Sequence, residues 1–262
     1  MDNEKIITKQ FLITPAAGKR LIAKSMLFIP AINKALESKT IVIIAGTTNG
    51  YVAEELLGDI NQAAQFSRNR FFRGVTMPPR YSVTDMGKLS SEDQFPGDVV
   101  IINGKWEKGL TIFDVVDSLK KGDIIIKGAN ALDVENKQAG IFIGHPKAGT
   151  INAVMQAVVG RRVELYLPIG LEKRISGNIN TIAQKLNSPN TSGLRMFPVT
   201  GNIITELDAI NIITKTNAEL VAAGGVCGAE GSCWVAVSGN EQQIDQVERL
   251  IQSICEEPNF LI

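Results

Sequence analysis

Two hydrophobic patterns alternate along the first 190 or so residues of this chain. Short apolar runs rich in β-branched residues recur at 41–44, 97–103, 123–128 and 163–168. Such continuous runs are typical of strands that are buried on both faces. Between the runs, apolar residues recur at spacings of three and four, as on the buried face of a helix. The alternation predicts an α/β fold: a Rossmann-like parallel sheet with helices on both faces.

Threonines mark several of the expected helix starts. Thr14 is followed by Pro15, a combination of N-cap and first-turn proline, and Thr111, Thr150 and Thr205 stand just before further helical patterns. Residues 141–144 form one more short apolar run, for which we expect a strand.

The amino-acid composition changes at residues 187–193, which are rich in Asn, Ser, Pro and Gly and are typical of a linker. Beyond it come a strand, a helix, a hairpin around a glycine-rich turn at 224–232, and a last helix at 241–254. This order is typical of a ferredoxin-like α+β module. We therefore predict an α/β domain over residues 1–190 and a small C-terminal module over residues 194–262.

A small-residue loop follows the first buried run and leads directly into a helix. Backbone N–H groups and the positive end of a helix meet at such a point, which favours phosphate and other anions. The alternative is an ordinary turn that binds nothing, because one such loop is a weak motif. The residues of this loop are Gly46, Thr47, Thr48, Asn49 and Gly50.

Composition narrows the range of functions. Lys+Arg and Asp+Glu number 27 each, so no general basic field attracts nucleic acid. The three cysteines have no metal-type spacing, and we expect neither a metal nor a cofactor. No apolar run reaches the length of a membrane span. The chain is expected to be cytoplasmic and to form a homo-oligomer.

Three segments together resemble one superfamily. They are Ala-Ala-Gly-Lys at 16–19 with the loop at 46–50, Lys-Gly-Ala-Asn-Ala-Leu-Asp at 127–133, and Lys-Ala-Gly-Thr at 147–150. The superfamily contains ribose-phosphate isomerase, glucosamine-phosphate deaminase, the CoA-transferases and the translation initiation factor 2B-like proteins. The resemblance implies a site for a small phosphorylated or anionic metabolite, to which it adds Gly128, Asn130, Gly149 and Thr150.

Two departures from the superfamily pattern weaken the case for catalysis. Thr48 stands where the phosphate loop would carry its second glycine, and Asn130 replaces the first of two carboxylates, so it cannot act as a general base. The Glu nucleophile motif of the CoA-transferases has no match.

Three residues are candidates for chemistry. Asp133 keeps the second carboxylate and could abstract a proton, with an Asx-turn as the alternative. His145, the one histidine, could transfer protons. Lys147 could stabilise an enediolate or hold a phosphate, and could equally be a solvated lysine. Weaker phosphate candidates are Lys19, Arg70 and Arg73, the last two in a segment that could instead be a surface loop with a strand at 71–75.

Two functions fit these observations. The first is an isomerase or deaminase that acts on a sugar phosphate or a similar metabolite. The second is a non-catalytic metabolite sensor or assembly subunit that kept the anion pocket and lost the carboxylate pair.

Overall fold

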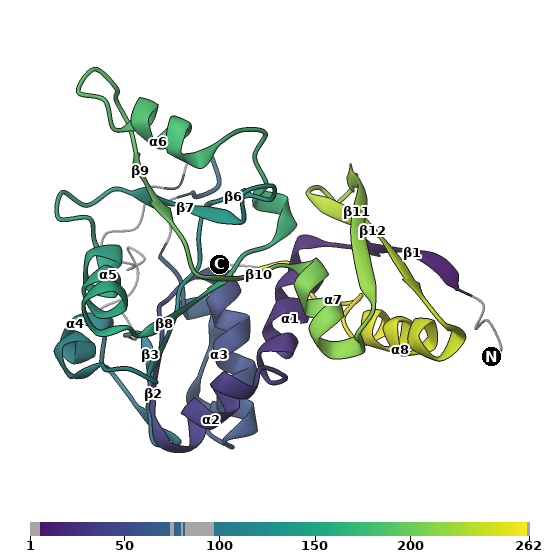
Figure 1. The fold of residues 1–262 in the computed structure, drawn as a ribbon, viewed down its shortest axis with the longest axis horizontal. Coiled ribbons are helices and arrows are strands. Elements are labelled where there is room, and N and C mark those ends of the chain that lie inside the picture. The colour runs from purple at the N-terminus through teal and green to yellow at the C-terminus, as the bar shows by residue number, and fades with distance from the viewer. Residues whose placement is uncertain (1–5, 74–75, 80, 82–96, 261–262) are drawn as a thin grey trace.

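A mostly parallel sheet forms the centre of the protein. The computed structural model describes residues 6–73, 76–79, 81 and 97–260 (Figure 1). The central sheet has the order β10-β8-β5-β2-β3-β4. Neighbours among β2 (Thr40–Ile43), β5 (Ile124–Ile126), β8 (Glu164–Pro168) and β10 (Asn202–Ile204) run parallel. The protein is therefore a mixed α/β fold, and the runs at 41–44 and 123–128 are parallel strands of one sheet, as predicted.

One edge of the central sheet runs against the expected direction. The run at 97–103 becomes β3 (Val99–Ile102), which pairs antiparallel with β2 and continues through a tight turn into β4 (Lys105–Glu107). Asn103 and Gly104 both have positive φ, which is the backbone that a two-residue hairpin requires. Hydrophobicity alone does not specify strand direction, so this antiparallel edge could not be read from the pattern.

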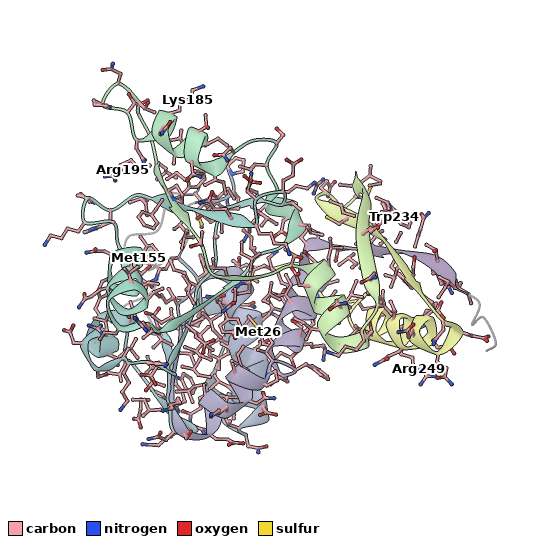
Figure 2. All side chains as sticks on the ribbon, in the orientation of Figure 1. Met26, Met155, Lys185, Arg195, Trp234 and Arg249 are labelled. Atoms are coloured by element: carbon pink, nitrogen blue, oxygen red, sulfur yellow. The ribbon has the colours of Figure 1, made fainter. Side chains whose placement is uncertain are left out.

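Helices cover both faces of the central sheet because successive residues of its strands point to opposite sides. Ile41 and Ile43 enter a core with α1 (Pro15–Met26), α2 (Pro30–Ser38) and α3 (Thr47–Asp59). Val42 and Ile44 enter a second core with α4 (Ile112–Val115) and α5 (Thr150–Arg161). In Figure 2, the label of Met26 lies among the helices of the first core, where that side chain is fully buried.

The helix starts follow the expected chemistry in part. Thr14 caps α1 by accepting a hydrogen bond from the N–H of Ala17 at 3.2 Å, and Thr205 caps α7 (Glu206–Thr214) in a capping box with Asp208. Thr150, in contrast, is the first residue of α5, and the N-cap is Gly149 with φ of 60°. The helix after Thr111 is also shorter than expected, because α4 ends at Val115 and a 3-10 turn follows.

A small antiparallel sheet lies beside the central one. It consists of β6 (Ala131–Asp133), β7 (Gln138–Ile143) and β9 (Arg195–Val199), in the order β6-β7-β9, with α6 (Ile179–Leu186) packed against it. The run at 141–144 therefore belongs to this sheet and not to the central one.

A third sheet has the order β1-β12-β11 and joins the two ends of the chain. β1 (Ile7–Ile13) pairs antiparallel with β12 (Ser232–Gly239), which also pairs with β11 (Asn217–Gly224). These strands, α7 and α8 (Glu241–Gln252) lie together at the right of Figure 1. Strands from the segment 194–262 thus enter all three of these sheets, and the division at 190 stays a prediction. The pairing of β1 with β12 was not foreseen.

No helix in the described ranges combines the length and the apolar character that crossing a membrane would require.

Candidate functional site

A large cavity opens at the carboxyl ends of β2 and β5. Its volume is about 1160 Å³, and it is lined by residues 45–49 after β2, 127–130 after β5, and most of 144–151 between β7 and α5. The three loops that the sequence nominated therefore share one cavity. In open α/β sheets, ligands bind at this end of the strands.

The first wall of the cavity is the start of α3. Gly46 is the N-cap, and Thr47, Thr48 and Asn49 of the first turn line the cavity. The Thr48 hydroxyl is buried and has no hydrogen-bond partner in the described part of the protein. Asn49 is mainly structural, since its Nδ2 donates to the carbonyl oxygens of Ile44 at 2.6 Å and Ile126 at 3.1 Å and so ties β2 to β5.

Gly50 does not line the cavity. It lies inside α3, where a Cβ atom would come within 3.0 Å of the Cβ of Arg68. The glycine therefore permits close packing against residues 68–70 and has no direct part in binding.

The second wall contains a buried lysine at the end of β5. The residue is 8% exposed, and Lys127 Nζ donates to the hydroxyl of Thr150, the first residue of α5, at 3.1 Å. Burial, helped by the positive charge of Arg73, lowers the pKa of Lys127 to about 8. Lys127 is not among the site residues predicted from the sequence. A usable signal was present, because a lysine directly after three buried isoleucines must stand at the carboxyl end of the strand.

Arg73 reaches the same cavity and is held by a buried carboxylate. One oxygen of Asp98 accepts hydrogen bonds from Arg73 Nη2 at 3.1 Å and from the N–H of Ala45 at 3.0 Å, and the other accepts from the N–H of Ile112 at 2.9 Å. Asp98 thereby fixes the loop after β2, the start of α4 and the arginine. Of the weaker phosphate candidates, Arg73 is thus the one at this cavity.

The other two weaker candidates lie elsewhere. Lys19 forms an ion pair with Glu172 at 3.6 Å, and Arg70 lines a separate cavity of about 80 Å³. The alternative strand at 71–75 is not formed at residues 71–73, while residues 74–75 lie outside the described part of the chain.

The cavity also has an extensive apolar side. The rings of Phe72 and Phe260 contact each other edge to face with centroids 5.4 Å apart. This contact places the segment that follows α8 at the cavity. The aromatic residues that line the cavity are Phe72, Tyr81, Phe113, Phe142 and Phe260. A ligand that filled this space would carry an apolar or planar part in addition to an anion.

The three residues predicted to be catalytic do not converge. His145 lines the cavity, and its Nδ1 accepts a hydrogen bond from the N–H of Lys147 at 3.1 Å. The Lys147 residue is exposed and is not among those that line the cavity. Asp133 lies at the end of β6, where its two oxygens accept hydrogen bonds from the backbone and side chain of Asn136, each at 2.9 Å. These bonds hold the pKa of Asp133 below its ordinary value.

The remaining nominated residues contribute to the lining. Asn130 faces the cavity, and its Oδ1 accepts the N–H of Phe142 at 3.0 Å, which fixes the side chain across to β7. Gly128, Gly149 and Thr150 also line it. The glycine-rich turn at 224–232 does not contribute, and Cys227 within it is an exposed free thiol.

The electrostatics of the cavity are one-sided. The lining residues in the described ranges include Arg73, Lys127 and Lys173 and no carboxylate. Burial lowers the pKa of Lys173 too, although Glu172 and Glu206 act against that shift. No group of three or more possible metal-ligating side chains occurs among the described residues. Comparison of the chain with models of protein families, with curated proteins and with solved structures finds no match.

Proposed function

We propose that the protein binds a small phosphorylated metabolite in the cavity at the carboxyl ends of β2 and β5. The observation that carries this proposal is the gathering of Arg73, Lys127 and Lys173 around the first turns of α3 and α5. Helix starts favour an anion through their free N–H groups and dipole, and the side chains add full charges.

The expected affinity is moderate. A hydrogen bond to a charged group contributes about 1.5–3 kcal/mol, and two or three of them must offset the cost of ordering the ligand. Binding in the micromolar to millimolar range follows. The size of the cavity, about 1160 Å³, leaves room for more than a phosphate group and favours a ligand with an apolar portion.

The chemistry that the site could support is proton transfer on the bound metabolite, as in isomerisation or deamination. His145 is the lining residue suited to it, because an imidazole can accept a proton on one ring nitrogen and donate one from the other. We leave Asp133 out of this mechanism, since its carboxylate is engaged by Asn136 and stands outside the lining.

A non-catalytic sensor or assembly subunit is the alternative function. Asn130 favours it, because an amide in place of a carboxylate keeps the hydrogen bond to Phe142 and removes a general base. Under this alternative the same ligands bind without turnover.

Distant kinship with the sugar-phosphate isomerase superfamily remains part of the proposal. It includes the Rossmann-like arrangement of the central sheet, a ferredoxin-like nature for the C-terminal segment, and assembly as a homo-oligomer. The parallel order of β2, β5 and β8 supports the first of these.

The proposal is tested with pairs of ligands that differ only in the phosphate. Isothermal titration with ribose phosphate and with ribose, and with inorganic phosphate alone, separates anion binding from sugar binding. We expect heat for both phosphates and none for ribose. Equal affinities for ribose and ribose phosphate would refute an anion site. Product analysis by NMR on the phosphates that bind distinguishes an enzyme from a sensor.

A further inference from the structure

The amine of Lys127 is buried without an ion pair to a carboxylate among the described residues. The structure gives its Nζ one hydrogen-bond partner, the Thr150 hydroxyl at 3.1 Å, and no ion pair with any described carboxylate. A buried ammonium without a carboxylate is costly, so proteins usually pair it or let it lose its proton. This combination occurs at the wall of the largest cavity described above.

The charged groups around Lys127 work against its ammonium form. Arg73 repels it, and Thr150 belongs to the first turn of α5, the positive end of that helix. Asp98 attracts it, but the oxygens of Asp98 already accept hydrogen bonds from Arg73 and from two backbone N–H groups. The other titratable residues in the described lining are Lys173, which is a second cation, His145 in the loop before α5, and Tyr81.

We propose that Lys127 is a nucleophile that forms an imine with an aldehyde or ketone carrying an anionic group. The inference rests on the proposed function for the anion and adds the carbonyl as the second required feature of the ligand. Amines activated in this way are desolvated or lie close to another cation, and Lys127 meets both conditions.

The reaction balances without a further reagent. The lone pair of Nζ attacks the carbonyl carbon and forms a C–N bond, while the carbonyl π electrons move to oxygen. One proton passes from nitrogen to that oxygen, for which the Thr150 hydroxyl is within reach of Nζ. The carbinolamine then loses its hydroxyl group and the second nitrogen proton as water, which leaves the C=N bond.

The protonation state separates this role from simple phosphate binding. With a pKa of about 8, about one Lys127 amine in ten is neutral at neutral pH, against roughly one in three thousand for an ordinary lysine. A lysine that served only to hold phosphate would gain nothing from being partly neutral, because a neutral amine attracts anions weakly. Lys173 fits the nucleophile less well, since Glu172 and Glu206 support its charge.

The test traps the imine by reduction. The wild-type protein is incubated with glycolaldehyde phosphate and sodium cyanoborohydride, and modified lysines are located by peptide mass spectrometry. We expect Lys127 to react about tenfold or more faster than the exposed Lys147 at neutral pH. Its rate should rise with a midpoint near pH 8 and fall when inorganic phosphate is added. Modification confined to exposed lysines, or a Lys127 profile identical to that of Lys147, would overturn the inference.

Two variants sharpen the result. Lys127→Arg keeps the charge and removes the nucleophile, so trapping at this position should vanish while inorganic phosphate still binds. Lys147→Arg is the matched control and should leave trapping at Lys127 unchanged. The site-resolved mapping on the wild-type protein decides the question even if a variant fails to fold.

Failure of this inference and failure of the proposed function have different signatures. Phosphate binding in titration without reduction at Lys127 refutes the nucleophile and leaves the anion site standing. Reduction at Lys127 that inorganic phosphate does not slow, with no heat of phosphate binding, refutes the anion site. Absence of both signals, the heat of phosphate binding and the reduction at Lys127, refutes both proposals.

Discussion

Two positive side chains that are shielded from solvent, Arg20 and Lys127, have opposite surroundings. Arg20 of α1 is partly buried and donates hydrogen bonds to Glu257 at 2.8 Å, Glu55 at 2.8 Å and Glu54 at 2.7 Å. At the cavity, Lys127 has a hydroxyl as its partner. Burial by itself lowers the pKa of Arg20, but the bonds to its carboxylates outweigh it and hold the pKa above the ordinary value.

The arginine region shows what a structural cluster looks like. Arg20 and Arg68 both lie over the ring of Tyr51, with guanidinium carbons 4.8 and 4.5 Å from its centroid. Arg68 also pairs with Glu54 and Glu257, so the cluster joins α1, α3 and the segment after α8. Charges in this cluster have carboxylate partners within the fold, so removing one partner is costly, whereas a charge without a paired carboxylate at a cavity is available to a ligand.

The largest effect is expected from breaking the paired region. Arg20→Met leaves Glu55 with Lys24 alone, at 3.8 Å, and leaves Glu54 and Glu257 with Arg68 alone. We expect the free energy of unfolding to fall by about 3 kcal/mol. Urea denaturation measures it. The matched control is Lys105→Met, which removes an exposed pair with Glu107 and should cost less than about 0.5 kcal/mol. Equal losses of unfolding free energy in the two variants would show that the Arg20 cluster contributes no more than an exposed ion pair.

Removing the charge of Lys127 should change the free energy of unfolding in the opposite direction. Lys127→Met replaces a buried ammonium by an apolar side chain of similar length, and we expect a gain in stability of about 1–3 kcal/mol at pH 7. Because the folded pKa is below the unfolded value, the wild-type penalty is present below pH 8 and is relieved between about 8 and 10.5. A destabilised Lys127→Met, with unchanged pH dependence, would show that the amine is structurally required.

A buried carboxylate, Glu206, shows the same effect of burial on a negative charge. Glu206 at the start of α7 is 3% exposed and accepts the N–H of Leu171 at 2.8 Å. Burial, with nearby Glu172, raises the pKa of Glu206 to about 7. As the pH rises, Glu206 keeps its proton to a higher pH in the folded state than in the unfolded state. The free energy of unfolding should therefore decline by about 2 kcal/mol between pH 4.5 and 7. Glu206→Gln should flatten this decline in denaturation curves. An unchanged slope would assign the decline to other groups.

Ligand affinity separates the cation predicted from the sequence from the one found in the structure. Lys127→Met should weaken binding of inorganic phosphate about tenfold or more, since one charge-assisted contact exceeds about 1.4 kcal/mol. Lys147→Met should change it less than about twofold, because that residue is exposed and outside the lining. Titration calorimetry on both proteins decides, and a larger loss in the Lys147 variant would restore the sequence-based assignment.

The smallest effect concerns Asp133. Asp133→Ala removes the acceptor of two hydrogen bonds from Asn136, and we expect a loss of about 1 kcal/mol in unfolding free energy with phosphate affinity unchanged. Asp133→Asn, which retains one acceptor oxygen, should lose less. A drop in affinity of tenfold in either variant would return Asp133 to the site.

Local sequence determined most of the secondary structure. Continuous apolar runs such as 41–44 and 123–128 can be buried on both faces only as strands inside a sheet. Thr14 and Thr205 predicted the start of their helices because an N-cap bonds to a backbone N–H only three residues away. The loops after β2 and β5 meet at one end of the central sheet because these strands are parallel neighbours. The loop at 144–150 follows β7 of the small antiparallel sheet, so its place at the cavity depends on tertiary structure.

Tertiary structure alone decided which residues face each other. The pairing of β1 with β12, the reversed direction of β3, and the separation of Asp133 from the cavity all depend on contacts between distant segments. The charge of a lysine is likewise written in the sequence, but its free energy depends on what surrounds it. Lys127 and Lys147 are the same residue type, and what distinguishes Lys127 is its burial and the lack of an ion pair with a described carboxylate.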